Sequence, residues 1–338
     1  KGASALFGAM PTDNSLTILN SAYHGELCTR FAIENDEFSL APDREGDVLL
    51  CPLRAKSGSV CNKPIDTRHF LTCSRVMNGA TWIHDTMRNT FWLPLVKRVL
   101  GSTVYSKEQR DTCLSSENKD KRPMDISWPT LSGTTLKGVD FGYADPLARF
   151  GIGALTNKVL SLYARKTGLA ATNMEKNKIK NLSNFHMLDG TPADKAVTPA
   201  VFETLGGCVS TGSKFFQFLA ERETPGDPKD DPSIRRSRQL WVSRERKRHT
   251  CHLVKIKHEL MVEKYNIIRR KRAFASSVPR GESPTRVAEV GVRRFDLKPS
   301  VSGLPARAGF DHEAESNVFD GPQKVEGLAE ASMVSVLV

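Results

Sequence analysis

The fold of this chain is decided by a predicted β-hairpin, Pro123-Met124-Asp125-Ile126-Ser127-Trp128 followed by Leu136-Lys137-Gly138-Val139-Asp140-Phe141. Between the two strand-like segments, Ser132-Gly133 suits a two-residue hairpin turn. With that turn, pairing runs outward until Asp125 faces Asp140 on one side of the ribbon, with β-carbons roughly 5 Å apart. The sequence therefore predicts two carboxylates side by side at the open end of the hairpin.

Two adjacent carboxylates repel each other and raise one pKa unless a cation lies between them. A hard cation such as Mg²⁺ is held in proteins by one or two carboxylates together with phosphate oxygens and water. That arrangement polarises a phosphate and supplies hydroxide for phosphodiester cleavage. The alternative interpretation is a pair of exposed aspartates that flank a turn and bind nothing.

A second cluster of chemically informative residues lies between positions 51 and 73. Cys51, Cys61, His69 and Cys73 supply three thiolates and one imidazole, a typical tetrahedral set for structural zinc. The short spacings from Cys61 to Cys73 suit a zinc knuckle, whereas nine residues separate Cys51 from Cys61. A loop of that length closes on a metal at little extra entropic cost. The alternative is three buried free cysteines and a surface histidine.

Composition points to an anionic partner. The chain has 338 residues, a formal net charge of +11 and a pI of about 9.3, which favour nucleic acid or an acidic membrane surface. The longest apolar runs fall far short of the ~18 residues that a membrane span needs. No signal peptide is recognisable at the start, which favours a cytosolic or nuclear protein. Seven widely spread cysteines, an odd number, argue against a disulfide framework.

Periodicity and composition divide the chain into five parts. We expect a helical segment (1–50), the Cys/His cluster with a second helix (51–105), an α/β region (106–222), a linker with a basic helix (223–274) and a disordered tail (275–338). In the first part, apolar residues at spacing four predict an amphipathic helix with Leu19, Tyr23, Leu27 and Phe31 on its apolar face.

The basic helix is predicted from two features of residues 233–272. This stretch holds 14 Lys and Arg against 3 Glu, and Leu253, Ile256, Leu260 and Ile267 keep a helical rhythm within it. We expect this helix to bind nucleic-acid phosphates with a steep dependence on salt, and its deletion to flatten that dependence.

Taken in order, these motifs resemble the C-terminal region of non-LTR retrotransposon reverse transcriptases that carry a restriction-like endonuclease. The Cys/His set is similar to that family's Cys-Cys-His-Cys knuckle. Trp82-Ile83-His84-Asp85 is similar to its Arg-His-Asn/Asp signature, with Ile83 in place of the arginine. Arg122-Pro123-Met124-Asp125 with Val139-Asp140 is similar to its Pro-Asp…Asp catalytic pair, with Met124 inserted. The similarity covers roughly residues 8–272.

The resemblance implies an α/β fold: a PD-(D/E)xK restriction-endonuclease-like mixed sheet flanked by helices, preceded by a small zinc knuckle and helices. It implies that Asp125 and Asp140 hold catalytic Mg²⁺, and that Lys178 or Lys180 stabilises the phosphorane charge or positions water. Glu203 and Glu108 are secondary acid candidates. The implied nucleic-acid-binding residues are His84, Arg88, Arg244, Arg246, Lys247 and Arg248.

The function implied by the resemblance is Mg²⁺-dependent nicking of DNA in the nucleus, or in the cytoplasm before import, with the element's RNA as a second partner. The fragment carries no polymerase catalytic motif. One alternative is a catalytically dead relic in which the knuckle and basic helix bind nucleic acid and the acids do nothing. Another is an interaction protein whose basic helix docks on an acidic partner.

Overall fold

The predicted hairpin forms two strands of a three-stranded mixed sheet. In the computed structural model, β1 (Ile126–Pro129) pairs antiparallel with β2 (Leu136–Ala144), and β2 pairs parallel with β3 (Val197–Glu203). Ile126 lies opposite Val139 and Pro129 opposite Leu136, which is the register predicted from the sequence. Asp125 comes just before this paired stretch and Asp140 just after it. A mixed α/β fold is thereby confirmed.

The structure describes residues 16–31, 35–40, 48–55, 57–65, 67–75, 78–101, 103–105, 123–130, 136–145, 168–187 and 190–277, all within a unit that spans Lys1–Arg280. The Ser132-Gly133 turn, Glu108 and most of the predicted tail lie outside the described residues. Of that tail, residues 275–277 belong to the last helix, so the helix extends slightly beyond the predicted boundary.

Strand β2 is covered on both faces, because its side chains alternate between two packed layers. Val139, Phe141 and Tyr143 enter the main hydrophobic core. On the opposite face, Asp140 and Gly142 lie against α6 (Leu169–Leu182), which belongs to the crossover that links β2 to the parallel strand β3. The short helix α7 (Ala193–Ala196) follows α6 and leads directly into β3.

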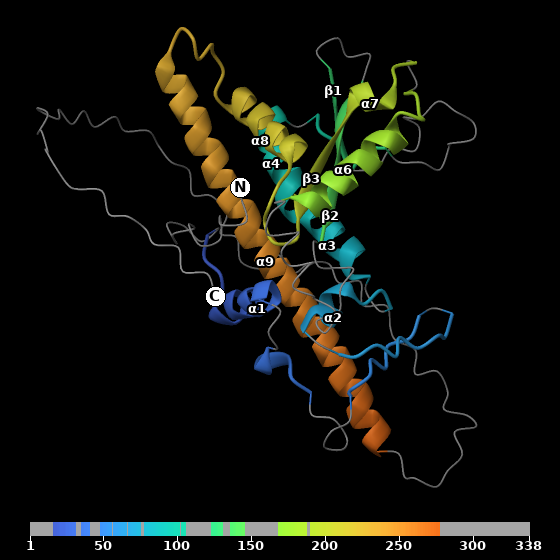
Figure 1. The fold of residues 1–338 in the computed structure, drawn as a ribbon. Helices are drawn as coiled ribbons and strands as arrows, with labels where there is room; N and C mark the ends of the chain where they lie inside the picture. The colour runs from blue at the N-terminus through green and yellow to red at the C-terminus, as the bar shows by residue number, and fades with distance from the viewer. Residues whose placement is uncertain are drawn as a thin grey trace, which may run out of the picture. The chain divides into compact units, whose positions relative to one another are not determined.

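The main core is built by helices from distant parts of the sequence (Figure 1). They are α3 (Gly79–Met87), the π-helical turn Arg88–Trp92, α4 (Leu93–Leu100), α8 (Ser210–Glu223) and α9 (Pro232–Ser277). The π-turn has a local cause. Pro94 has no N–H to donate to Thr90, and its ring would crowd that carbonyl in a regular α-helix, so the ladder shifts and Leu93 donates to Arg88 instead.

Helix α9 passes along the whole unit, packing against α8, α3, α2 (Thr67–Thr72) and α1 (Asn20–Phe31). Leu253, Ile256 and Leu260 are buried, as their spacing predicts, and Ile267 is partly buried beside Ile268. Residues on both sides of the boundaries predicted at 105/106 and 222/223 contribute to the same core. Deleting α9 would therefore remove part of the hydrophobic core and unfold the protein. Deletion consequently cannot test whether the charge of α9 binds nucleic acid.

The first predicted helix forms, but its buried face differs from the expected one. Leu19 is 70% exposed, whereas Ala22, Glu26 and Thr29 are buried. Glu26 accepts hydrogen bonds from Arg30 on its own helix and from Lys257 of α9. A buried carboxylate needs such partners, so ion pairing rather than the aliphatic stripe sets the rotation of α1. Between α1 and the Cys/His cluster lies a short 3₁₀ helix, η2 (Asp36–Phe38).

A hydrogen-bonded chain of aromatic side chains ties α9 to the sheet. Trp92 Nε1 donates to Tyr143 Oη over 2.8 Å, and the Tyr143 hydroxyl lies 3.2 Å from His249 Nε2. Because the tryptophan is only a donor, the tyrosine hydrogen is free to donate to a neutral histidine. Burial lowers the pKa of His249 to about 3, so the imidazole stays neutral in the folded protein.

Among the described residues, the helices are too short or too polar to cross a bilayer.

Lowering the pH should destabilise the fold through His249. The unfolded histidine binds a proton near pH 6.5 and the folded one only near pH 3, so protonation favours unfolding within that window. One such group contributes a slope of up to ~1.4 kcal/mol per pH unit. In denaturant titrations between pH 7 and 4, His249→Gln should show a shallower loss of stability with acid than the wild type. Equal slopes would contradict the neutral buried imidazole.

Candidate functional site

The first half of the metal-ligand set lies on a hairpin-like ribbon. Cys51 N–H donates to Lys63 O over 2.9 Å, and Cys61 N–H donates to Leu53 O over 2.8 Å. The ribbon turns at Gly58, whose φ of +83° is readily adopted by glycine. The irregular nine-residue spacing between the two cysteines is therefore the length of two ribbon arms and a turn, which brings both thiols to one end.

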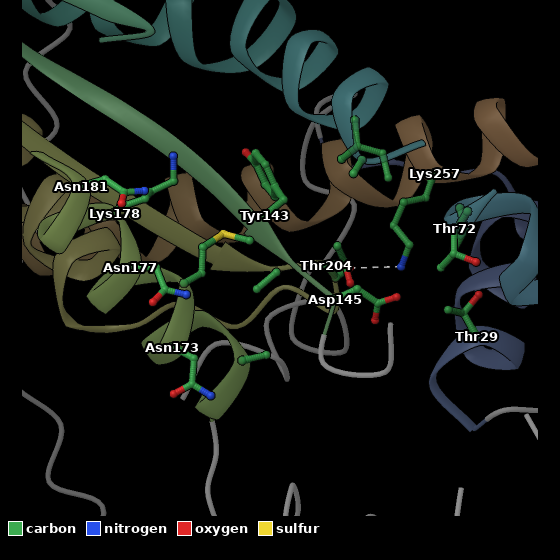
Figure 2. Close-up of a pocket in the computed structure, with 16 residues that line it drawn as sticks. Thr29, Thr72, Tyr143, Asp145, Asn173, Asn177, Lys178, Asn181, Thr204 and Lys257 are labelled. Carbon is green, nitrogen blue, oxygen red and sulfur yellow. Dashed lines mark hydrogen bonds between the residues drawn. The ribbon is translucent and has the colours of Figure 1, made fainter. Parts of the chain in front are cut away.

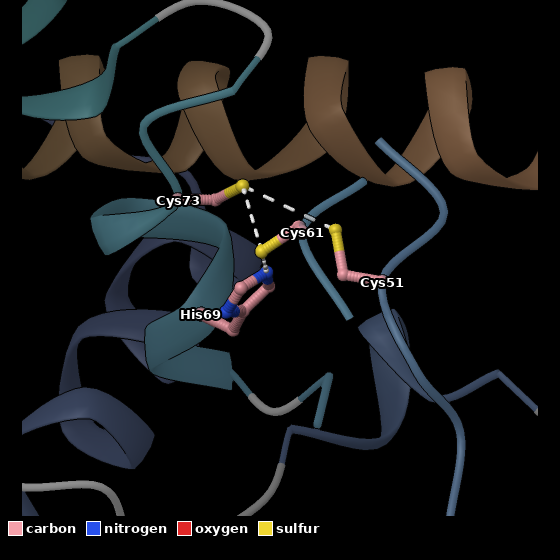
Figure 3. Close-up of side chains that lie close together, drawn as sticks. All are labelled: Cys51, Cys61, His69 and Cys73. Carbon is pink, nitrogen blue, oxygen red and sulfur yellow. Dashed lines mark hydrogen bonds between the residues drawn. The ribbon is translucent and has the colours of Figure 1, made fainter. Parts of the chain in front are cut away.

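The second half of the set comes from one helical turn. His69 is in α2 and Cys73 follows its end, with the Cys73 N–H donating to the His69 carbonyl over 2.8 Å. Residues four apart on a helix share one face, so both side chains meet the hairpin thiols, as Figure 3 shows. The four ligand atoms all lie within 4.8 Å of one another. The predicted cluster is confirmed.

The cluster has the dimensions of a tetrahedral metal site. Cys73 Sγ lies 4.0 Å from Cys51 Sγ and 3.9 Å from Cys61 Sγ, and Cys61 Sγ lies 3.6 Å from His69 Nε2. A tetrahedron with metal–sulfur bonds of ~2.3 Å has sulfur atoms about 3.8 Å apart. A hydrogen bond from the Cys51 thiol, opposed by burial and aided by His69, lowers the pKa of the Cys73 thiol. These donors fit zinc.

A buried lysine compensates the charge of this cluster. Three thiolates around a divalent zinc ion leave one net negative charge, which is costly to bury alone. Lys264 of α9 is fully buried, and its Nζ donates to the Cys73 carbonyl over 2.7 Å. Burial lowers the pKa of Lys264 to about 8, opposed by the charges of Cys73, Cys51 and Cys61. The site is thus anchored on α9 by charge as well as by packing.

The predicted pair of acids lies in a second cluster, where Asp125 is almost completely buried. Its Oδ2 accepts hydrogen bonds from the Phe141 N–H over 2.7 Å and from His84 Nε2 over 2.9 Å. Arg88 Nη1 lies 3.7 Å from its Oδ1. Burial by itself would raise the pKa of Asp125, but the His84 contacts and the Phe141 amide outweigh burial and lower it. Asp125 is an ionised carboxylate in the folded protein.

His84 is doubly bound to carboxylates. Its Nδ1 lies 3.0 Å from Asp85 Oδ1 while its Nε2 contacts Asp125. Both ring nitrogens must donate to serve two carboxylates, which requires the imidazolium form. Although burial opposes it, these two acids raise the pKa of His84 to about 9. His84, predicted to contact nucleic acid, is a charged partner of the acid site in this structure. Asp85 belongs to the same predicted signature, but its contact with His84 was not predicted.

Asp140 is paired with the lysine that the sequence singled out. Lys178 Nζ lies 2.6 Å from Asp140 Oδ1, and the two side chains are each 22% exposed. Burial and the charge of Asp125 raise the pKa of Asp140 to about 6, against the opposing effect of Lys178. Gly142 makes this approach of α6 feasible, because a Cβ there would lie 2.9 Å from Lys178 Cε.

The other predicted catalytic residues lie elsewhere. Glu203 is opposite Ala144, four positions along β2 from Asp140, or roughly 13 Å at ~3.3 Å per residue. It is buried, and the Ala171 N–H in the first turn of α6 donates to its carboxylate. Glu203 therefore caps a helix. Lys180 is exposed on α6, two residues beyond Lys178, and does not contact the acid pair.

The predicted basic residues differ in their exposure. Arg88 is bound within the acid cluster. Arg246 donates to Ser213 and lies over the Phe216 ring, while Arg244 and Arg248 contact the buried carboxylate of Glu245. Lys247 is half-buried and Arg244 is 56% exposed at its side chain. Part of the positive charge of α9 is thus used within the fold.

No protein-family model, curated protein or solved structure matches this chain. The assignment of a function consequently depends on the two clusters themselves.

The metal cluster generates a direct prediction. Purified protein should carry about one zinc ion per chain by elemental analysis, because four converging protein ligands form a closed structural site. Cys61→Ser should lose that zinc and unfold at a lower temperature, and chelation should do the same to the wild type. Cys208→Ser, which alters a described cysteine outside the cluster, should keep its zinc. Protein purified without zinc, or equal zinc in both variants, would contradict the assignment.

Proposed function

We propose that this chain is a Mg²⁺-dependent endonuclease that nicks DNA, and that it derives from the C-terminal region of a non-LTR retrotransposon reverse transcriptase with a PD-(D/E)xK nuclease domain. The observation that carries the proposal is the convergence of Asp125, Asp140 and Lys178. Asp125 directly precedes β1, Asp140 lies in β2, and Lys178 reaches Asp140 from the crossover helix α6.

The arrangement of charges supports a site for a cation and a phosphate. Asp125, Asp140 and Asp85 are matched by His84, Arg88 and Lys178, so the cluster is balanced within the protein. A divalent cation held by Asp125 and Asp140 would compete with Lys178 for Asp140. The displaced ammonium group would then be placed to bind the phosphate oxygens, which are anionic and gain charge during hydrolysis.

Each residue has a separate task in this proposal. Bound Mg²⁺ supplies Lewis-acid polarisation of the phosphate and a more acidic water. Asp125, held ionised by His84 and the Phe141 amide, provides a fixed carboxylate ligand. Asp140 is the more exposed acid, and it is the ligand whose contact with Lys178 the metal would replace. Lys178 stabilises the phosphorane.

The zinc cluster and the basic helix serve DNA binding in this proposal. The zinc site is structural, because four protein ligands leave no open position for catalysis. It fixes the hairpin against α9, and α9 presents exposed arginines such as Arg235, Arg236 and Arg244. The net charge of +11 supplies the electrostatic attraction to phosphates. We place the protein in the nucleus, with DNA as substrate and the element's RNA as a second partner.

One observation favours the second candidate, a relic that binds nucleic acid without cutting it. Asp125 is only 5% exposed, and its Oδ2 already accepts from His84 and Phe141. A carboxylate with these partners is a stable structural element whether or not a metal arrives. Under this alternative, DNA binding persists and Mg²⁺ changes nothing.

Asp140→Asn separates the two candidates. This substitution removes one metal-ligating charge and leaves the fold and the DNA-facing cations intact. Mg²⁺-dependent conversion of supercoiled plasmid to the nicked form should fall by on the order of 100-fold or more. Affinity for DNA measured in EDTA should be unchanged or slightly higher, since a negative charge is lost.

The matched control is Asp194→Asn, which changes an exposed aspartate on α7 and should nick like the wild type. Equal nicking by Asp140→Asn and the wild type would overturn the assignment of Asp140. A wild type that binds plasmid but never nicks it in Mg²⁺ would establish the relic instead.

A further inference from the structure

A cavity of about 520 Å³ lies beside the acid cluster and shares Lys178 with it (Figure 2). One wall is the side of α6 that carries Asn173, Asn177 and Asn181. The facing wall combines the apolar side chains of Leu71 and Ile83 with the polar side chains of Thr29, Thr72 and Lys257. The volume falls within the ~300–1,000 Å³ typical of sites for organic ligands. It is therefore large enough for one nucleotide.

The cavity opens where the topology of the sheet favours ligand binding. Ala144 ends β2 and Thr204 follows β3, and both line the cavity. Because β2 and β3 are parallel, their carboxyl ends meet at one edge of the sheet. In open α/β sheets, ligands bind in the crevice outside the carboxyl ends of the strands. Asp140 lies four positions further back on β2, where Lys178 contacts it.

The three asparagines form an unusual row. They lie four residues apart on one face of α6, and all three are exposed. Their side-chain amides make no hydrogen bond to any other described residue. Asparagine is a weak helix former, so three of them on one helical face lower the stability of α6 without adding a contact. Such a row has the chemistry of a recognition surface rather than of a structural one.

We infer that this cavity receives one unstacked nucleotide of a DNA strand, next to the phosphodiester bound at the Asp125–Asp140 cluster. Each asparagine amide offers a donor and an acceptor, which match the edge of a base and are typically paired with adenine. The apolar part of the facing wall, Leu71 and Ile83, suits the face of a base, as in enzymes that take a nucleotide out of the stack. The inference rests on the proposed function, because Lys178 both lines the cavity and contacts Asp140, where the phosphate would bind.

A base in the cavity predicts energetic coupling between Asn177 and one position of the strand. We would measure affinity for single-stranded oligonucleotides of about twelve nucleotides, each carrying one abasic position, in EDTA so that no cleavage occurs. For the wild type, one or two adjacent abasic positions should weaken binding by about five- to tenfold. Asn177→Ala should weaken binding of the intact strand by a similar factor. In this variant, the same abasic position should lower the affinity by less than about twofold.

Asn184→Ala is the matched control, because Asn184 is exposed just beyond the end of α6 and does not line the cavity. This variant should reproduce the wild-type abasic profile. A profile in which no position is coupled to Asn177 would overturn the inference and leave the nuclease proposal intact. Binding of free deoxyadenosine monophosphate with the same dependence on Asn177 would also overturn it, by assigning the cavity to a free nucleotide. A failure to nick plasmid overturns only the nuclease proposal, since these measurements need no cleavage.

Discussion

Both candidate sites depend on the buried face of helix α9. Near its middle, His249 accepts from Tyr143 of β2, which fixes the sheet that carries Asp140. About two turns further, Lys257 binds Glu26 and the carbonyl of Thr204, which follows β3. Further still, Lys264 reaches the zinc cluster. His249, Lys257 and Lys264 have partners on three different segments. A buried charge without its partner costs several kcal/mol. The helix thus sets the register of its neighbours as well as covering them.

The features that could be predicted were those encoded locally. The alternation of apolar residues and the expected Ser132-Gly133 turn predicted the pairing of β1 with β2. A slip by one residue would turn every core side chain outward. The Cys/His set was recognisable from ligand types alone, even though the ribbon that explains the gap between Cys51 and Cys61 was not. The family resemblance predicted Lys178 as a residue of the acid site, and Lys178 contacts Asp140.

The features that escaped prediction are polar contacts between residues far apart in the sequence. Glu26 and Lys257 are far apart in the sequence, so nothing local showed that they would turn α1 away from its aliphatic stripe. The sequence also did not show that His84 contacts Asp125, or that Glu203 accepts a hydrogen bond from the first turn of α6. One such contact had a signal in the sequence. Lys264 lies at a position of α9 where the spacing of the apolar residues predicts burial, and a buried lysine needs a polar or charged partner.

The central claim is that Asp125 and Asp140 together bind a divalent cation in exchange for the Lys178 contact. A crystal structure of the protein in Mn²⁺, with anomalous scattering recorded at the manganese edge, tests this most directly. The account predicts an anomalous peak at ~2.2 Å from one oxygen of each carboxylate, with the Lys178 ammonium group withdrawn from Asp140. Saturating Mn²⁺ that leaves no peak there, with Lys178 still on Asp140 and His84 still on Asp125, would contradict it.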